Sequence, residues 1–187
     1  QTRIAVIALF FYAMAAGTAA ADKTLVAWVQ LTTLEQQGGS ALALQDGDRF
    51  DAIVYGECLA HRWMAGSEYF HRTEKEQAGN SAENASPDTL VQIAVVYSGN
   101  SILIYRQGEM YASYATENMS LDLTDQSQVM FGLRHVNGSG DLFSGVIEDA
   151  RIYRQALTAE QIRGLRPNTV SSIEPAAWWS FEEGALR

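Results

Sequence analysis

Apolar and polar residues alternate over many short stretches of the chain, which is the period-2 pattern of half-buried β-strands. The clearest case is TLVAWVQL at residues 24–31, where every second position from Leu25 to Leu31 is apolar. Further strands are predicted at residues 40–45, 49–55, 62–66, 101–106, 109–115 and 129–135. With the strands described below, this makes about ten short strands at near-regular spacing, which predicts an all-β sandwich or barrel.

Two internal stretches depart from simple alternation. Residues 90–97, LVQIAVVY, are nearly all apolar and predict a central strand that is buried on both faces. Residues 67–88 are irregular and mostly polar, and they contain the turn sequences Gly79-Asn80 and Ser86-Pro87. A loop of this length in a compact domain is usually functional or mobile, which makes the region a candidate for a binding site.

Residues 145–165, GVIEDARIYRQALTAEQIRGL, predict one strand, a turn and one short helix. Apolar side chains alternate up to Ile152, and Thr158 has the position of a helix N-cap. Gln161, three residues later, completes the pattern of a capping box, and Pro167 limits any extension of the helix. Asp149 and Arg151 lie on one strand face, where we expect them to pair in a structural role.

This segment resembles the closing segment of laminin-G-like, concanavalin A-like jelly-roll domains, which follows the pattern G-x-I-D-D-x-R-I-Y-x-x-A-L-(S/T)-x-x-E-I. Glu148 replaces the first Asp of that pattern, and Gln161 replaces its late Glu. The matching positions are Gly145, Ile147, Asp149, Arg151, Ile152, Tyr153, Ala156, Leu157, Thr158 and Ile162. The resemblance implies a two-sheet antiparallel β-sandwich, a jelly roll, with one short C-terminal helix. It leaves function open, because lectins, adhesion modules and glycosidases share this fold.

The chain divides into three parts. In residues 1–21, Arg3 precedes an apolar run and three alanines, which predicts a signal peptide; a buried helix or a membrane anchor is the alternative. We therefore expect export, to the periplasm, the cell surface or the medium, and no membrane span in the mature form. Residues 22–167 are the expected laminin-G-like jelly-roll domain. Residues 168–187 are a linker followed by one more strand.

That last strand, AAWWSFEEG at residues 176–184, resembles the W-x-F-D-E-G opening strand of the same family. Two positions are open to it. It can fold back and close this sandwich beside the strand at 145–153, or it can open a following domain in the same chain. An unpaired edge strand is a liability for a sheet, which favours closure of this sandwich. A following domain is compatible with that closure, so both can be true.

Charge and cysteine content narrow the function. A formal net charge of -9 argues against a nucleic-acid partner. Cys58 is the only cysteine, so an intramolecular disulfide and a zinc-ribbon site are both excluded. The resemblance to laminin-G-like domains, and not the charge, implies glycans and cell-surface or matrix proteins as the expected partners.

Three aspartates at short spacing, Asp46, Asp48 and Asp51, are candidate ligands for a calcium ion. Calcium prefers carboxylate and carbonyl oxygens, and many members of the resembled family carry calcium at a loop end. The alternative is structural: Asp46-Gly47 is an ordinary hairpin turn, and Asp51 can alternate onto a solvent-facing position.

Five residues around the irregular loop are candidate sugar contacts: Glu57, Trp63, Tyr69, His71 and Arg72. Sugars bind through aromatic rings that cover their apolar faces and through polar side chains that bond their hydroxyl groups. The alternative is that Trp63 and the neighbouring Phe70 belong to the core and that the charged groups are solvated. Trp28, Trp178 and Trp179 are expected in core or edge packing.

Enzyme motifs are lacking. Retaining glycosidases of this fold usually carry an E-x-D-x-x-E strand, which the chain does not contain. Glu148-Asp149 and Glu182-Glu183 are adjacent pairs, whose side chains point to opposite faces of a strand. The sequence therefore favours a non-catalytic carbohydrate-binding or adhesion-type module, an accessory part of a larger and perhaps glycan-degrading protein. The alternatives are a structural or protein–protein interaction domain and a divergent glycoside hydrolase.

Overall fold

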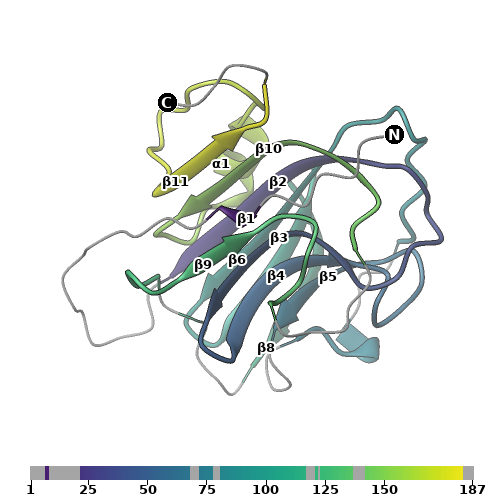
Figure 1. The fold of residues 1–187 in the computed structure, drawn as a ribbon, viewed down its shortest axis with the longest axis horizontal. Helices are drawn as coiled ribbons and strands as arrows, with labels where there is room; N and C mark the ends of the chain where they lie inside the picture. The colour runs from purple at the N-terminus through teal and green to yellow at the C-terminus, as the bar shows by residue number, and fades with distance from the viewer. Residues whose placement is uncertain are drawn as a thin grey trace.

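The computed structural model describes residues 7–8, 22–67, 72–77, 81–116, 121, 123–136 and 142–182. These residues form two antiparallel β-sheets that pack face to face, with helical turns outside them (Figure 1). The two-sheet, all-β sandwich predicted from the sequence is confirmed.

The five-stranded sheet has the order β1-β9-β3-β4-β5. Its strands are β1 (Ile7–Ala8), β3 (Gly39–Asp46), β4 (Arg49–Tyr55), β5 (Trp63–Ser67) and β9 (Gln128–Met130). The six-stranded sheet has the order β11-β10-β2-β6-β7-β8. Its strands are β2 (Lys23–Leu31), β6 (Val91–Ser98), β7 (Ser101–Arg106), β8 (Glu109–Ala115), β10 (Gly145–Tyr153) and β11 (Ala177–Ser180), and the helical segments are η1 (Lys75–Gln77) and α1 (Ala159–Gly164).

Alternate residues of each strand fill the space between the sheets. Leu25, Ala27 and Val29 of β2 belong to one buried apolar cluster with Leu44 of β3 and Ile53 of β4. Burying one such aliphatic side chain contributes about 1.5–3 kcal/mol, so this layer supplies most of the driving force for folding. The residues in between point to the outer faces of the sandwich.

The central position predicted for residues 90–97 is confirmed by β6, which lies between β2 and β7. Ile93 and Val95 face the inner cluster, while Ala94 and Val96 join a second buried cluster on the outer face of the sheet. That outer cluster is covered by α1, through Ile162.

Helix α1 begins with the capping box that the sequence predicts. The Thr158 side chain accepts from the Gln161 backbone N–H, and the Gln161 side chain accepts from the Thr158 backbone N–H. Two donors that a helix start leaves unpaired are thereby satisfied. Gly108, in the β7–β8 turn at φ +74, lets the backbone pass close to Arg163, because an added Cβ would lie 2.5 Å from the Arg163 Cβ.

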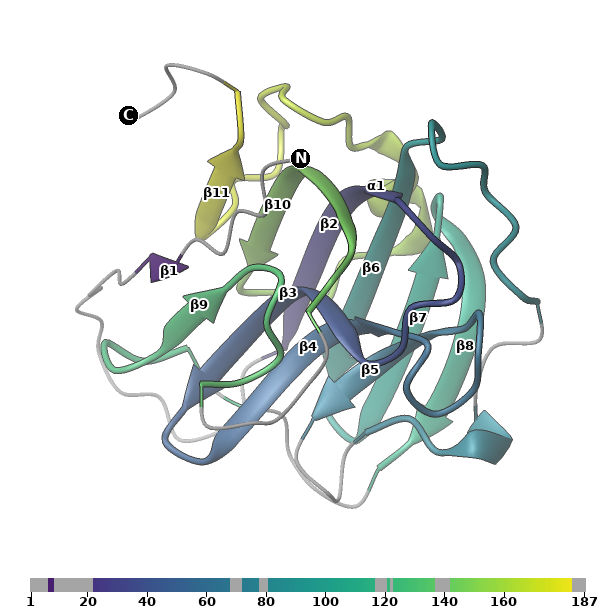
Figure 2. The same cartoon turned by 45° about the vertical axis from the view of Figure 1, so that its right-hand side comes forward.

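Strand β11 closes one edge of the six-stranded sheet. It pairs antiparallel with β10, with Arg151 opposite Trp178 and Ala150 opposite Trp179. Trp179 packs edge-on against Phe131, with ring centroids 5.2 Å apart. Of the two positions open to residues 176–184, the strand takes the one beside β10, as Figure 2 shows for the yellow segment; a following domain stays a prediction.

The strand predicted at residues 129–135 is shorter than expected, because β9 ends at Met130. Gly132 adopts a positive φ of +76 and turns the chain, and its carbonyl accepts from the Phe143 N–H. Residues 133–136 therefore leave the sheet edge, which brings Arg134 and His135 to a position that the strand pattern did not predict.

The signal peptide predicted at residues 1–21 lies outside the described residues except for β1, which pairs with β9. Within the described part of the chain, no helix has the length and apolar character needed to cross a membrane.

Candidate functional site

The three candidate calcium ligands do not come together. Asp51 is buried, and its carboxylate lies 2.6 Å from the Lys23 ammonium. It also accepts from the Ser67 hydroxyl at 3.2 Å and from the Leu121 backbone N–H at 3.0 Å. Its oxygens are therefore occupied by donors from both sheets, so it does not alternate onto a solvent-facing position.

The Asp46 carboxylate accepts from the Thr124 hydroxyl at 2.6 Å, and Asp48 is exposed in the β3–β4 turn. Across the described residues, no group of three or more His, Cys, Asp or Glu side chains is arranged to hold a metal ion. The placement of these aspartates therefore gives calcium binding no support.

Trp63 is fully buried, so the prediction that its ring contacts a sugar is wrong. It begins β5 on the inner face, and its ring packs edge-on against Tyr55 with centroids 4.9 Å apart. Its indole N–H donates to Glu83 at 2.8 Å. Alternation alone could not decide which face of this short strand is the inner one.

Glu83 organises the buried end of the irregular region, and the sequence offered no signal for it. Its carboxylate accepts from the Arg106 guanidinium at 2.8 and 2.7 Å and from the backbone N–H groups of Asn84 and Ala85 at 3.0 Å. Burial alone would raise the pKa of Glu83, but the hydrogen bonds from Arg106, Trp63 and the backbone lower it below its ordinary value. This network holds the loop onto the sheet.

Two predicted sugar contacts, Glu57 and Arg72, do meet. The Glu57 carboxylate lies 3.4 Å from Nη1 of Arg72, and it forms an ion pair with Arg134. The Arg134 Nε is buried and has no hydrogen-bond partner among the residues that the structure describes. Tyr69 and His71, the other two predicted contacts, lie outside the described residues.

A pair of half-buried rings lies next to this carboxylate. Phe50, on the outer face of β4, stacks against His135 with centroids 5.0 Å apart and an interplanar angle of 27°. Burial lowers the pKa of His135, the charge of Arg134 lowers it further, and the charge of Glu57 opposes both effects. His135 directly follows Arg134 in the chain, so the ring pair lies near the ion pair between Arg134 and Glu57. We call the five residues Phe50, Glu57, Arg72, Arg134 and His135 the Glu57 cluster.

The outer face of the six-stranded sheet carries a pocket of about 520 Å³. Trp178, Arg151 and the segment from Val170 to Ala177 line it, and we call it the Trp178 pocket. The Arg151 guanidinium is stacked between two indoles, 5.0 Å from the Trp28 ring centroid and 4.7 Å from that of Trp178. Nothing in the strand pattern predicted a pocket here, because residues 168–175 were expected to be a linker.

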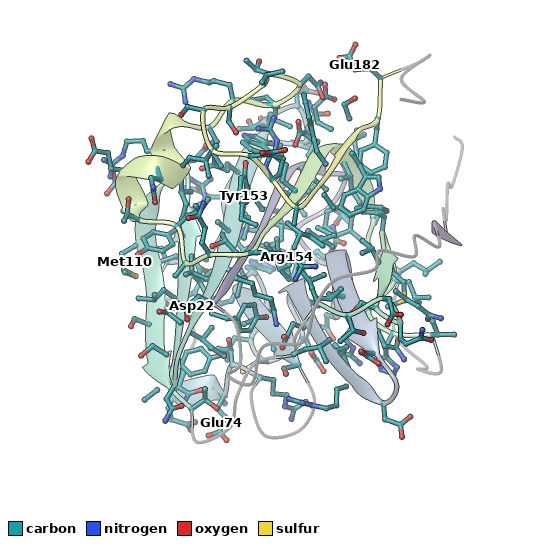
Figure 3. The ribbon with its side chains drawn as sticks, turned by 90° about the vertical axis from the view of Figure 1, so that its left-hand side faces the viewer. Asp22, Glu74, Met110, Tyr153, Arg154 and Glu182 are labelled. Carbon is teal, nitrogen blue, oxygen red and sulfur yellow. The ribbon has the colours of Figure 1, made fainter. Side chains whose placement is uncertain are left out.

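Two carboxylates that are far apart in sequence lie close together near this pocket. Glu148 and Glu182 both accept from the side-chain amide of Asn168, at 2.7 and 2.9 Å. Glycoside hydrolysis needs two carboxylates that flank a sugar, whereas here an amide group stands between them. Figure 3 shows Glu182 on the segment that follows β11, away from the β-sheet core. The arrangement is that of a structural clamp on the Asn168 turn.

Comparison with known proteins identifies the fold family. The family model of the concanavalin A-like lectin/glucanases superfamily matches residues 12–163. No curated protein matches the chain.

Several solved structures share the fold at low sequence identity. Domain 4 of AbnA, an extracellular GH43 arabinanase from Geobacillus stearothermophilus solved with arabinotriose, is 17% identical with a TM-score of 0.57, and the match covers 77% of this chain and 65% of that one. The CBM40 of a Ruminococcus gnavus sialidase, bound to α2,6-sialyllactose, is 19% identical with a TM-score of 0.58, over 78% and 82% of the two chains. A putative carbohydrate-binding protein from Bacteroides ovatus has a TM-score of 0.70 at 14% identity, and the match covers 95% of this chain but 49% of that protein.

Proposed function

This chain belongs to the concanavalin A-like lectin/glucanase superfamily, and we propose that it is a non-catalytic, exported carbohydrate-binding module whose sugar site is the Glu57 cluster. The observation that carries the proposal is the Glu57 carboxylate held by two arginines beside the Phe50–His135 ring pair. The parent protein would use the module to hold a glycan close to another domain.

The chemistry of the Glu57 cluster suits a sugar. Carboxylate oxygens accept from sugar hydroxyls, guanidinium N–H groups donate to them, and an aromatic ring covers the apolar face of the sugar ring. Arg134 is 16% exposed and Glu57 23% exposed, so both are held in place yet remain within reach of a ligand. Planar groups that are already ordered lose little conformational entropy on binding, which favours affinity.

The similar structures support the same function. One is a domain of an arabinanase solved with arabinotriose, and another is a sialidase module bound to sialyllactose. Both are parts of glycan-degrading proteins, which fits an accessory role for this chain. At 17% and 19% sequence identity these similarities support a shared fold and not a shared ligand, so an experiment has to identify the sugar.

A glycan-array screen of the full chain tests the proposal. We expect binding to a defined set of glycans, and a loss of about tenfold or more in Arg72→Ala and Glu57→Gln, because each removes a charged hydrogen-bonding group. Arg154→Ala and Glu160→Gln are the matched controls, since both residues are exposed and lie outside the Glu57 cluster.

The screen is run with calcium and with chelator, because the sequence predicted a calcium site. Binding that vanishes with chelator would make calcium part of the function despite the placement of Asp46, Asp48 and Asp51. Array binding that is equal in the variants and the native protein would move the sugar site elsewhere. No binding under either condition would favour the structural or protein-interaction alternative.

A further inference from the structure

We propose that the Trp178 pocket is a second, separate binding site and that it takes a neutral saccharide. The ligand class rests on the proposed function, but the site is a different one. It is built by β10, β11 and residues 170–177, on the outer face of the six-stranded sheet, whereas the Glu57 cluster belongs to the outer side of the five-stranded sheet.

The pocket has the size and the mixed lining of a sugar site. Its volume of about 520 Å³ falls within the range of roughly 300–1,000 Å³ typical of ligand pockets. Trp178 and Val170 give it apolar walls, and Ser172 and Glu174 give it a hydroxyl and a carboxylate. A sugar ring presents the matching surfaces, an apolar face and a rim of hydroxyl groups.

Trp178 is exposed and yet held firmly, which is what an aromatic platform requires. Its side chain keeps 37% of its accessible surface, while its indole N–H donates to Asp149 at 2.8 Å. The Arg151 guanidinium lies 4.7 Å from the ring centroid and supports the ring from below. A ring that is already ordered loses little rotamer entropy when a sugar stacks on it.

The charges around the pocket favour a neutral ligand. The positive charge of Arg151 is compensated by its two-point ion pair with Asp149, so the guanidinium on the pocket floor does not attract an anion. Glu174 is exposed and makes no hydrogen bond or ion pair with the described residues. Its free carboxylate can accept from sugar hydroxyls, and it repels acidic sugars.

The two sites lie on the outer faces of opposite sheets, and Figure 2 shows these sheets as two separate layers. A molecule with this arrangement binds two glycan chains, or two points on one glycan network, at the same time. Once one site is bound, the other is held close to the same surface, so its effective concentration is high. Bivalent attachment therefore increases retention on a polysaccharide even if neither site binds more tightly by itself.

Titration calorimetry of the full chain with soluble trisaccharides of glucose, galactose, mannose and arabinose tests the inference, with sialyllactose as the charged comparison. The principal variant is Ser172→Trp, which fills the pocket from an exposed position; Ser113→Trp, on the exposed surface of β8 in the same sheet, is its matched control. Glu174→Gln removes the carboxylate charge at nearly constant shape. Trp178 itself is left intact, since its N–H belongs to the Asp149 network.

We expect at least one neutral trisaccharide to bind both the native protein and Arg72→Ala. Its affinity should fall about tenfold or more in Ser172→Trp and severalfold in Glu174→Gln, and stay unchanged in Ser113→Trp. Binding that Arg72→Ala abolishes and Ser172→Trp leaves intact would overturn the second site and keep the proposed function. A neutral trisaccharide that binds no better than sialyllactose would overturn the assigned ligand class. Absence of all saccharide binding would overturn both.

Discussion

Asp149 and Arg151 form a two-point ion pair that is fully buried on the outer face of the six-stranded sheet, with Nε–Oδ1 and Nη2–Oδ2 distances of 2.9 Å. The same carboxylate accepts from the Trp178 indole N–H and from the Asn168 backbone N–H. One aspartate therefore connects β10, the turn after α1 and β11. Tyr153, two residues beyond Arg151 on the same face, lies beneath the segment between α1 and β11 (Figure 3).

Asp149→Ala should destabilise the protein by about 3–5 kcal/mol, because it leaves a buried guanidinium without its counter-charge. Urea unfolding measures the change. The double variant Asp149→Ala/Arg151→Met should lose clearly less than the sum of the two single losses, because the uncompensated charge is gone. If the double variant instead loses the sum of the two single losses in unfolding free energy, Asp149 and Arg151 do not stabilise the protein as a pair.

Trp178→Ala should cost about 1–3 kcal/mol, because it removes the hydrogen bond to Asp149 and the stacking on Arg151. Trp178→Phe keeps an aromatic ring over Arg151 and loses the N–H, so it should fall between the native protein and the alanine variant. Thermal unfolding of the three proteins ranks them by melting temperature. Equal stability of the phenylalanine variant and the native protein would show that the indole N–H contributes nothing.

Glu83→Gln should destabilise the protein at neutral pH by about 2–4 kcal/mol, because the charged acceptor for Arg106 and Trp63 is lost. The pKa of Glu83 is lowered by these contacts, so its stabilising contribution is complete above the ordinary glutamate value of about 4.3 and is lost as the pH falls through the folded-state value. Urea unfolding at pH 7 and at pH 3 should therefore show the native protein and the variant converging in acid. A constant difference across this range would refute the linkage.

His135 should be neutral at pH 7, because burial and the Arg134 charge lower its pKa. Between the folded-state value and the ordinary value of about 6.5, the unfolded chain binds more protons than the folded one. Stability should therefore decline as the pH falls below about 6.5, and His135→Gln should weaken that decline. Proton NMR titration of the imidazole, assigned with the same variant, tests whether the pKa of His135 is lowered. A titration midpoint above about 6.5 would contradict the prediction.

Expression of the chain with its first 21 residues in an exporting host should yield a mature protein that begins at or near Asp22. N-terminal sequencing of the exported protein identifies the cleavage site. Retention of residues 1–21 in the exported protein would contradict the signal-peptide prediction and support an anchor or a structural segment.

The sequence by itself determined the class of fold and most of its local structure. Alternation predicted β4, and the turn at Gln107-Gly108 predicted the hairpin of β7 and β8, all three at their observed bounds. The capping box of Thr158 and Gln161 and the pairing of Asp149 with Arg151 were also predictable, since both are contacts between near neighbours. All of these features depend on residues only a few positions apart.

The tertiary structure alone decided which of the candidate residues meet. Alternation does not say which face of a short strand turns inward, so Trp63 and Asp51 proved to be buried with Glu83 and Lys23 as partners. The Glu57 cluster depends on Arg134 and His135, which reach it because Gly132 ends β9 early. The Trp178 pocket exists because β11 returns to β10. In each case the contact joins residues far apart in the chain, and its position depends on sheet packing, which local pattern does not encode.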